Sequence, residues 1–407
     1  MARQSERINV AVFIDYAGET GGAETLAVQL VERLDPARFG RTLVVFRRIE
    51  RDDPLADEHA AVAARLRRGG VDVLALDRDG RLDLAAWRPF LRRLRAGEID
   101  VLHSHKFGPN VWASLLARLA DVPVVVAHEH TWSFVGEPLR KLLDRFLIAT
   151  GADLVVAVSE QDRERMARIE RIPAGRIRVL PNGIPPPAVE RDAAAVRAEL
   201  GIPAGAPLIG TIGVLRPQKD FGTLVAAHAR LLRSRPDARL AIVGGGPLHD
   251  ELAALIAREG VGERVRLLGP RGDAVELAAA FDVAVNSSLY EGSSLAVIEY
   301  MALGLPIVAT AVGGNPDLLD GGGAGLLVEP GDPAALAEAI GSLLADPARA
   351  RALGERARAR QRQRYDLDLQ VRRLEQLYEQ LFAAATSAAP RSRLSRARRP
   401  LPRLPTS

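Results

Sequence analysis

The chain of 407 residues contains no cysteine. This absence excludes disulfide bonds, thiolate metal ligands and a cysteine nucleophile. A chain without disulfides suits a reducing compartment, and we therefore expect a cytoplasmic location.

Long hydrophobic runs are also missing. No uninterrupted apolar run reaches eighteen residues, and no apolar stretch of signal-peptide length precedes Asp15. We therefore expect neither a transmembrane helix nor a signal peptide. The segment Trp87–Arg95 is basic, aromatic and amphipathic, and it has two interpretations. One is contact with anionic lipid or a lipid-phosphate acceptor, which would make the protein peripheral to the inner face of the membrane. The other is the ordinary outer helix of an α/β domain.

Outside its C-terminal tail the sequence also lacks an excess of basic residues, although the whole chain has a net charge of +4. The tail from Ala389 to Ser407 holds six arginines and no acid, so the rest of the chain carries 49 basic and 51 acidic residues, a net charge of −2. A nearly neutral body argues against a nucleic-acid partner. We expect the Pro- and Arg-rich tail to be disordered, with a weak electrostatic membrane contact as an open alternative.

Short apolar runs that alternate with helical periodicity dominate the first half of the chain. The runs are apolar throughout, as expected for strands whose sheet is covered by helices on both faces. The predicted strands are Ile8–Ile14, Thr42–Phe46, Val71–Leu76, Val101–His103, Val122–Ala127, Leu154–Val158 and Ile177–Leu180.

The same pattern restarts after Pro185-Pro186-Pro187, which continue neither a helix nor an inner strand. The second set of predicted strands is Leu208–Ile212, Leu240–Val243, Val265–Leu268, Val283–Asn286, Ile307–Ala309 and Leu326–Val328. This predicts an α/β protein with two Rossmann-like, doubly wound parallel-sheet domains that face a central cleft. The predicted boundaries are 1–184, 185–365, a C-terminal helix at 366–387 and a tail at 388–407.

The segment from Tyr290 to Gly304 carries the strongest functional signal, because it follows a predicted strand and runs into a predicted helix. The free amides of a helix start favour a phosphate or diphosphate. Glu291 in the loop and Glu299 two turns into the helix are carboxylates that can accept hydrogen bonds from sugar or ribose hydroxyls. The residues expected at the helix start are Gly292, Ser293, Ser294 and Leu295. The ordinary alternative is a serine N-cap on an amphipathic helix.

Two cations follow the first strand of the second half. Arg216 and Lys219 lie where they would neutralise a diphosphate leaving group, although solvated surface charges are the alternative. Gly213 and Gly245 lie in strand-to-helix turns where a glycine lets the backbone approach a ligand. Gly21 and Gly22 form a similar loop in the first half. That loop matches neither a dinucleotide-binding fingerprint nor a Walker loop.

Four of the seven histidines lie close together in the sequence, at His103, His105, His128 and His130. Each pair ends a strand, and the i, i+2 spacing places both side chains on one face. Three interpretations compete: a metal site, a cleft-lining set that binds acceptor and phosphate, or packed histidines that close the strands. The cleft interpretation is favoured because Glu129 is expected to point to the opposite side.

Together these features resemble a known family, glycosyltransferase family 4, a retaining family with the GT-B fold. The resemblance covers about residues 8 to 385 and rests on Glu291-x7-Glu299, Arg216-x-x-Lys219, the Gly21-Gly22 loop, Asn182-Gly183 and His130.

The resemblance implies a nucleotide-sugar donor, here guessed to be a UDP-sugar, and a polysaccharide or lipid-linked acceptor. It implies that Arg216 and Lys219 bind the donor diphosphate, that Glu299 holds the ribose, and that Glu291 contacts the transferred sugar. His130 matches the cleft histidine of the family, with His105 and His128 as acceptor-side candidates. No metal or other cofactor is implied. Ser293-Ser294 replace a common Phe-Gly pair, which puts the identity of the donor sugar in doubt.

Other functions remain as alternatives. A nucleotide-sugar epimerase of the same fold would act without an acceptor. A glycoside hydrolase would need Glu291 and Glu299 across one bond. A metal hydrolase would use the four histidines. A non-enzymatic binding protein is the alternative if Arg216 or Glu299 does not face the cleft.

Overall fold

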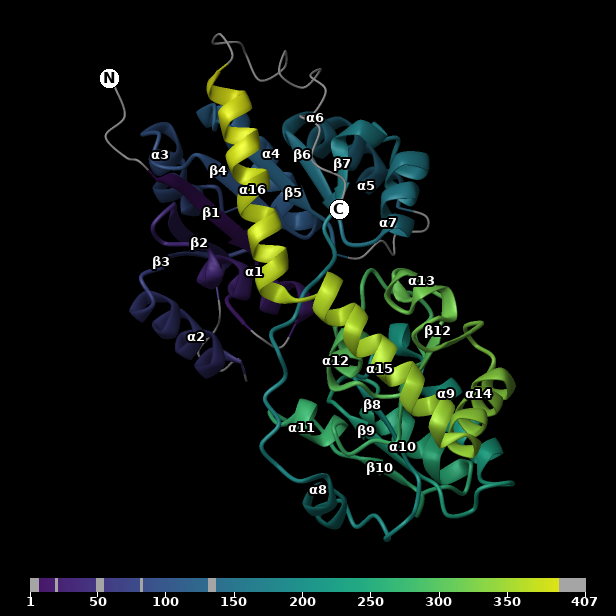
Figure 1. Ribbon diagram of the computed structural model, residues 1–407. Helices are drawn as coiled ribbons and strands as arrows, with labels where there is room; N and C mark the ends of the chain where they lie inside the picture. Colours follow the sequence, from purple (N-terminus) through teal and green to yellow (C-terminus); the bar gives the residue numbers. More distant parts are fainter. Residues whose placement is uncertain (1–6, 19–20, 49–54, 81–82, 131–136, 388–407) are drawn as a thin grey trace. The chain divides into compact units, whose positions relative to one another are not determined.

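The computed structural model describes residues 7–18, 21–48, 55–80, 83–130 and 137–387 (Figure 1). The contacts between residues divide the chain into two compact units. The N-terminal unit holds the described residues up to Pro181 together with those from Asp368 onward, and the C-terminal unit is Asn182–Leu367.

The N-terminal unit is built on a sheet of seven strands in the order β3-β2-β1-β4-β5-β6-β7. All neighbouring strands pair in parallel. The order reverses between β1 and β4, which makes the carboxyl ends of these strands the expected ligand site. The strands are β1 (Ile8–Ile14), β2 (Phe39–Arg47), β3 (Asp72–Arg78), β4 (Val101–His105), β5 (Val124–His128), β6 (Leu154–Ala157) and β7 (Ile177–Val179).

Helices connect these strands and bury their apolar faces against the sheet. They are α1 (Gly22–Arg33), α2 (Ala56–Arg68), α3 (Arg88–Arg95), α4 (Phe107–Ala120), α5 (Pro138–Leu143), α6 (Ala149–Gly151) and α7 (Glu160–Arg165). Trp87, Phe90 and Leu94 are fully buried in the core. The apolar face of Trp87–Arg95 therefore packs inside the protein, as expected for the outer helix of an α/β domain, which was the second interpretation of this segment.

The C-terminal helix α16 (Leu367–Thr386) packs on the N-terminal unit (Figure 1). Arg38 Nη1 lies 2.9 Å from a Glu375 carboxylate oxygen, and the same carboxylate accepts the Asp35 amide at 2.7 Å. Tyr378 is fully buried against Phe39 and the His103 ring. The helix thus combines an ion-paired edge with a buried aromatic anchor.

The C-terminal unit contains a second parallel sheet, of six strands in the order β10-β9-β8-β11-β12-β13. Its order reverses between β8 and β11, so these strand ends form a second switch point. The strands are β8 (Leu208–Ile212), β9 (Arg239–Val243), β10 (Val265–Leu267), β11 (Val283–Asn286), β12 (Ile307–Thr310) and β13 (Leu326–Val328).

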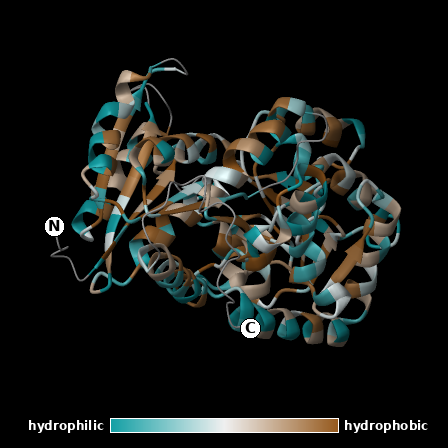
Figure 2. Cartoon of the chain, turned by 90° about the horizontal axis from the view of Figure 1, so that it is seen from above, coloured by the Kyte–Doolittle hydropathy of each residue, from teal (hydrophilic) through white to brown (hydrophobic). Residues whose placement is uncertain are grey.

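Helices of the C-terminal unit cover this sheet in the same way. They are α8 (Ala193–Glu199), α9 (Phe221–Leu231), α10 (His249–Arg258), α11 (Ala274–Ala278), α12 (Leu295–Leu303), α13 (Asn315–Leu318), α14 (Pro333–Ala345) and α15 (Pro347–Arg364). Figure 2 shows predominantly hydrophobic strands and helices on which hydrophilic and hydrophobic residues alternate. The helical path is interrupted between α15 and α16. There the Ile184 amide donates to the Tyr365 carbonyl, and the Leu367 amide donates to the Ile184 carbonyl.

The predicted fold class, two doubly wound parallel α/β sheets, is confirmed. Strand ends differ by a few residues. The fourth strand reaches His105 and the fifth runs from Val124 to His128, so three of the four clustered histidines belong to the sheet itself. Within the described ranges, no helix has the length and apolar content needed to cross a bilayer.

Candidate functional site

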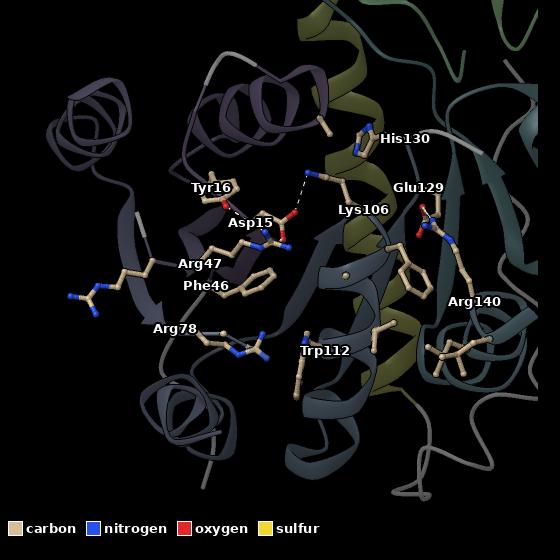
Figure 3. A pocket seen from close by; sticks show the side chains of 18 residues that line it. Asp15, Tyr16, Phe46, Arg47, Arg78, Lys106, Trp112, Glu129, His130 and Arg140 are labelled. Carbon is tan, nitrogen blue, oxygen red and sulfur yellow. Dashed lines mark hydrogen bonds and ion pairs between the residues drawn. The ribbon is translucent and has the colours of Figure 1, made fainter. Parts of the chain in front are cut away.

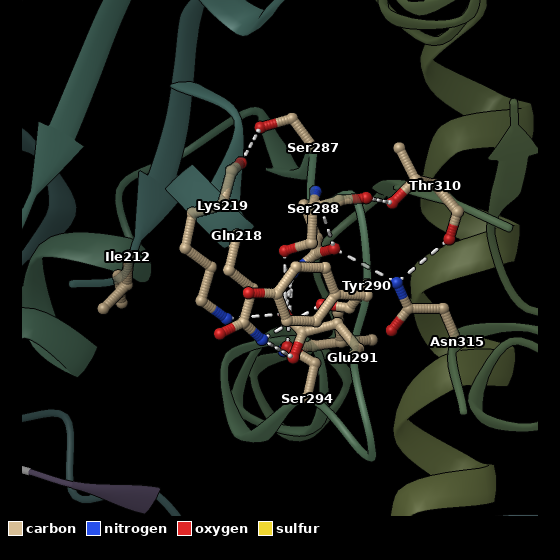
Figure 4. Close-up of polar contacts among 12 residues, drawn as sticks. Ile212, Gln218, Lys219, Ser287, Ser288, Tyr290, Glu291, Ser294, Thr310 and Asn315 are labelled. Carbon is tan, nitrogen blue, oxygen red and sulfur yellow. Dashed lines mark hydrogen bonds and ion pairs between the residues drawn. The ribbon is translucent and has the colours of Figure 1, made fainter. Parts of the chain in front are cut away.

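The switch point of the C-terminal unit holds an ion pair between Lys219 and Glu291. Lys219 ends a short 3-10 turn after β8, and Glu291 lies between β11 and α12. Lys219 Nζ is 2.5 Å from Glu291 Oε1, and the two side chains are 20% and 6% exposed (Figure 4). The structure thus brings together two predicted site residues that are far apart in sequence.

A polar network fixes the Glu291 carboxylate. Ser288 Oγ donates to Oε1 at 2.7 Å, Asn286 Nδ2 donates to the same oxygen at 3.3 Å, and Gln218 Nε2 donates to Oε2 at 3.3 Å. Asn315 in turn donates to Asn286 Oδ1 at 3.1 Å. These bonds orient the carboxylate with its cationic partner before any ligand arrives, which is the preorganisation that charge stabilisation requires.

Helix α12 begins beside this pair. Ser294 is its N-cap, and the Ser294 hydroxyl accepts the Val297 amide at 3.4 Å. The preceding Gly292 carbonyl accepts the Gly314 amide at 2.7 Å, which ties the loop to the chain after β12. Ser293 Oγ is buried and has no hydrogen-bond partner among the described residues. The helix start can hold a phosphate through its first amides, including that of Leu295.

Two further predicted residues are differently placed. Glu299 lies in the middle of α12 and is half-buried. Burial raises the pKa of Glu299 to about 7, and the charge of Lys219 opposes this shift. Arg216 is exposed and makes no side-chain hydrogen bond or ion pair with any residue that the structure describes. It is therefore a cation that a ligand can engage without breaking an existing contact.

The glycine turns of this unit bring backbone segments close together. A side chain at Gly244 or Gly246 would collide with the backbone of Gly213 or Leu215, and both glycines have positive φ. Gly245 packs near Pro270, and Gly213 lies above the aliphatic part of Lys219. These contacts give Gly213 and Gly245 a packing role whether or not a donor binds there.

The N-terminal unit has its own pocket, with a volume of about 1030 Å³, at the carboxyl ends of its strands (Figure 3). Its lining mixes charged and apolar side chains. The cationic lining residues are Arg47, Arg48, Arg78, Lys106 and Arg140, the acidic ones are Asp15 and Glu129, and the apolar ones include Phe107, Val111, Trp112, Leu139 and Leu143.

Lys106 bridges two acids at the inner end of this pocket. Its ammonium lies 3.0 Å from Asp15 Oδ2 and 2.5 Å from Glu24 Oε1. Gly21 is the N-cap of α1, Gly22 is its first residue, and a side chain at Gly21 would collide with the Glu24 carboxylate. The start of α1 therefore already has an acidic neighbour, which an anion at Gly21 and Gly22 would have to displace. The predicted loop residues Glu19 and Thr20 lie outside the described residues.

Arginine and aromatic side chains form the other end of the pocket. The Arg78 guanidinium lies 4.7 Å from the Trp112 ring centroid and 5.2 Å from that of Trp87. Burial lowers the pKa of Arg78. Arg47 is more exposed, lies over the Tyr16 ring and reaches within 3.8 Å of Asp15. This end can therefore bind an anion or stack a flat polar group.

The histidine cluster is only partly available to a ligand. His130 is half-buried and lines the pocket, as predicted for a cleft residue. His105 and His128 do not line it, because their side chains are 0% and 1% exposed. Their assignment as acceptor-contacting residues is therefore corrected: of the four clustered histidines, only His130 lines this pocket. His130 Nε2 lies 2.9 Å from His105 Nδ1.

Sequence reasoning missed most of the residues that complete both sites. These are Asp15, Arg47, Arg78, Lys106, Arg140, Asn286, Ser288 and Asn315. A usable signal existed for three of them: Asp15 follows β1, Lys106 follows β4 and Asn286 ends β11. Polar residues at the carboxyl ends of parallel strands are ligand candidates by position alone.

Family models match both halves of the chain. The model described as Glycosyltransferase Family 4 matches residues 20–186, and the model described as Glycosyl transferases group 1 matches residues 192–360. Curated relatives include a D-inositol 3-phosphate glycosyltransferase of Corynebacterium jeikeium, 31% identical over 89% of this chain and 93% of the relative. A protein of the same name from Kineococcus radiotolerans is 32% identical over 84% and 86%.

Solved structures share the fold. Anabaena HepE in complex with UDP has a TM-score of 0.75, with 24% identity over 90% of this chain and 98% of HepE. Sucrose-phosphate synthase from Thermosynechococcus elongatus has a TM-score of 0.77, with 27% identity over 93% and 100%. The fold is GT-B, and the protein is an enzyme that transfers glycosyl groups. On this sequence evidence the chain belongs to glycosyltransferase family 4.

Proposed function

We propose that the protein transfers a sugar from a nucleoside diphosphate sugar, with UDP as the expected nucleotide, to a hydroxyl group with retention of anomeric configuration. In this proposal residues 185–365 form the donor domain and residues 1–184 the acceptor-side domain. The observation that carries the donor assignment is the combination of Lys219, the free Arg216 and the start of α12 around one switch point. A UDP complex of the structurally similar HepE supports the choice of nucleotide.

In the proposed donor complex, Arg216 and Lys219 stabilise the charge that grows on the departing diphosphate. The amides of Gly292, Ser293, Ser294 and Leu295 bind its phosphate oxygens. The ribose hydroxyls donate to Glu299, which must then be ionised. The Lys219 ammonium then interacts with the phosphate as well as with Glu291. Ser288 and Asn286 continue to donate hydrogen bonds to the Glu291 carboxylate.

We propose a same-face displacement. The bond between the sugar anomeric carbon and the diphosphate breaks, the acceptor oxygen bonds to that carbon on the same face, and the hydroxyl proton passes to a donor phosphate oxygen. No protein base is needed, because the donor phosphate oxygen accepts the proton. Arg216 and Lys219 supply the positive charge that a divalent ion supplies in metal-dependent transferases, so we expect transfer to persist in EDTA.

For the acceptor, we propose a small hydroxylated compound that carries phosphate or carboxylate. The support is the cationic end of the N-terminal pocket, with Arg47 and Arg78, together with relatives named for inositol 3-phosphate. His130 is the proposed contact to the reacting hydroxyl. The polysaccharide and lipid-linked acceptors expected from the sequence are retained as test substrates, and cytoplasmic location with weak membrane contact remains a prediction.

The experiment is a transfer assay with UDP-, GDP- and ADP-sugars against phosphorylated, neutral and lipid-linked acceptors, with the product examined by NMR. We expect acceptor-dependent release of UDP and a product whose anomeric configuration equals that of the donor. An inverted product would contradict the retaining mechanism. Conversion of the donor without any acceptor would instead indicate an epimerase.

A further inference from the structure

Three histidines of the N-terminal unit are buried without a part in the proposed transfer. His103 and His105 lie on β4 and His128 on β5, and their side chains are at most 1% exposed. His105 and His128 are direct neighbours in the strand register. His103 is two residues before His105, so all three side chains lie on one face of the sheet.

The opposite face uses different residues. Ser104, between the two β4 histidines, donates to Asn110 of α4, and Asn110 donates to Glu129 at 2.7 Å. Glu129 thus points away from the histidines, as its place in the sequence predicted. The histidine face contains no carboxylate in direct contact with the three rings among the described residues.

Four ring nitrogens of this cluster lack protein partners among the described residues. His103 Nε2, His105 Nε2 and both nitrogens of His128 make no hydrogen bond with any residue that the structure describes. Leaving a buried polar group unpaired costs about 1–3 kcal/mol, so four such atoms in one place call for a ligand. Burial, together with the neighbouring histidines, holds the pKa of all three rings well below the usual value.

We propose that His103, His105 and His128 form a binding site for one divalent first-row transition-metal ion, with Zn²⁺ as the best match. One ligand nitrogen from each ring lies within 4.8 Å of the other two. Tetrahedral zinc with Zn–N bonds of about 2.0–2.1 Å needs nitrogens about 3.3 Å apart, so metal binding requires the rings to rotate toward one another. Two histidines at i, i+2 on a strand and a third on its neighbour supply three ligands from rigid backbone.

Two other ring nitrogens of the cluster have partners suited to such a site. His103 Nδ1 lies 2.5 Å from the Tyr378 hydroxyl of α16, and His105 Nδ1 lies 2.9 Å from His130 Nε2. Hydrogen bonds at the outer nitrogen fix the tautomer and ring orientation of metal-binding histidines. Lys106 is the cation that acts on His130, and its charge is balanced by Asp15 and Glu24.

This site is separate from the donor chemistry, because Arg216, Lys219 and Glu299 belong to the other unit. We assign the ion a structural role, in which it links β4 and β5 and, through His103 and Tyr378, supports α16. Donor binding and metal binding can therefore fail independently in experiments.

The test uses full-length protein without a polyhistidine tag, dialysed against EDTA and then titrated with Zn²⁺ or Co²⁺. We expect one equivalent per chain, a rise in thermal midpoint with Zn²⁺ and visible Co²⁺ absorption typical of a four-coordinate ion with three imidazole ligands. His128→Gln should lower Zn²⁺ affinity at least tenfold, and Tyr378→Phe should lower it about 10- to 100-fold through the outer hydrogen bond.

His228→Gln is the matched control. His228 is also buried, but it stands outside the cluster. This variant should still bind one equivalent. Binding of less than a tenth of an equivalent by folded wild-type protein would overturn the proposal, as would unchanged affinity in His128→Gln. The Zn²⁺ titration of wild-type protein tests the proposal even where a cluster variant does not fold.

Discussion

Lys219 and Glu291, 72 positions apart in the chain, form a 2.5 Å ion pair at the switch point of the C-terminal sheet. Glu291 has three further donors in Ser288, Asn286 and Gln218, whereas the Lys219 side chain has Glu291 as its partner among the described residues. The carboxylate is thus held without the lysine, but the lysine is positioned by the carboxylate. This asymmetry allows the proposed catalytic role of Lys219 to be tested apart from a structural one.

Replacing Lys219 with alanine should lower turnover far more than it harms folding. Loss of one preorganised charge at a leaving group costs about 10²- to 10³-fold in kcat. The measurement is kcat at saturating donor and acceptor, together with the thermal midpoint of each protein. Lys141→Ala removes a lysine that lines neither site and should leave kcat unchanged. Wild-type turnover in Lys219→Ala would contradict the assignment.

Glu299 makes stability depend on pH in a specific direction. Its pKa in the folded protein is about 7, above the ordinary value of 4.5, because burial disfavours the charge. Between these values the folded state keeps a proton that the unfolded chain releases, so this contribution to stability is lost as the pH rises through about 7. Glu299→Gln should therefore gain stability relative to wild type on going from about pH 5 to about pH 8 in denaturant titrations.

The affinity for nucleotide should rise with pH, whereas the contribution of Glu299 to stability falls. If ribose hydroxyls donate to ionised Glu299, wild-type affinity for UDP rises between about pH 6 and pH 8. Glu299→Gln should bind UDP more weakly and lose this pH dependence. Equal pH profiles for the two proteins in calorimetric titrations would remove Glu299 from the ribose site.

The cap of α12 should contribute measurable stability. Ser294→Ala removes the acceptor for the Val297 amide and for Asn286, so we expect a loss of about 1 kcal/mol in the free energy of unfolding. Ser342→Ala on α14 removes a hydroxyl that only donates to the carbonyl of Ala339 in its own helix, and should change stability by less than about 0.5 kcal/mol. Equal effects of the two changes would show that the Ser294 hydroxyl does not cap the helix.

The cationic pocket should discriminate between acceptors. Arg47→Gln removes a pocket charge that is only loosely paired with Asp15, and we expect KM for a phosphorylated acceptor to rise about tenfold. KM for the donor should not change. Arg93→Gln, which alters an arginine paired with Asp72 and Glu98 outside the pocket, is the control. A rise in KM that is equal for neutral and phosphorylated acceptors would contradict an anion-binding role.

Much of the fold was predictable because each strand is a local signal. Runs such as Ile8–Ile14 and Leu208–Ile212 are apolar throughout, and their spacing by helices leaves few arrangements other than parallel sheets. Strand ends were less predictable. Polar His105 and His128 continue their strands because the backbone ladder extends to them regardless of side-chain type.

The candidate sites were predictable only in part, because long-range contacts carry no signature in spacing. Sequence position placed Lys219, Glu291 and Ser294 near strand ends, but neither the ion pair nor its support by Asn315 could be read from it. The contact between His103 and Tyr378, 275 positions apart, decides that this histidine is buried rather than cleft-lining. Burial of this kind depends on which helix returns to cover the sheet.

The most direct test of the proposed donor site is calorimetric titration of wild-type protein, Arg216→Met and Glu299→Gln with UDP, GDP and ADP. We predict that one nucleotide, expected to be UDP, binds wild type with one-to-one stoichiometry and binds each variant at least about tenfold more weakly. Failure of all three nucleotides to bind, or equal affinity for wild type and both variants, would contradict a donor site built on Arg216, Lys219 and α12.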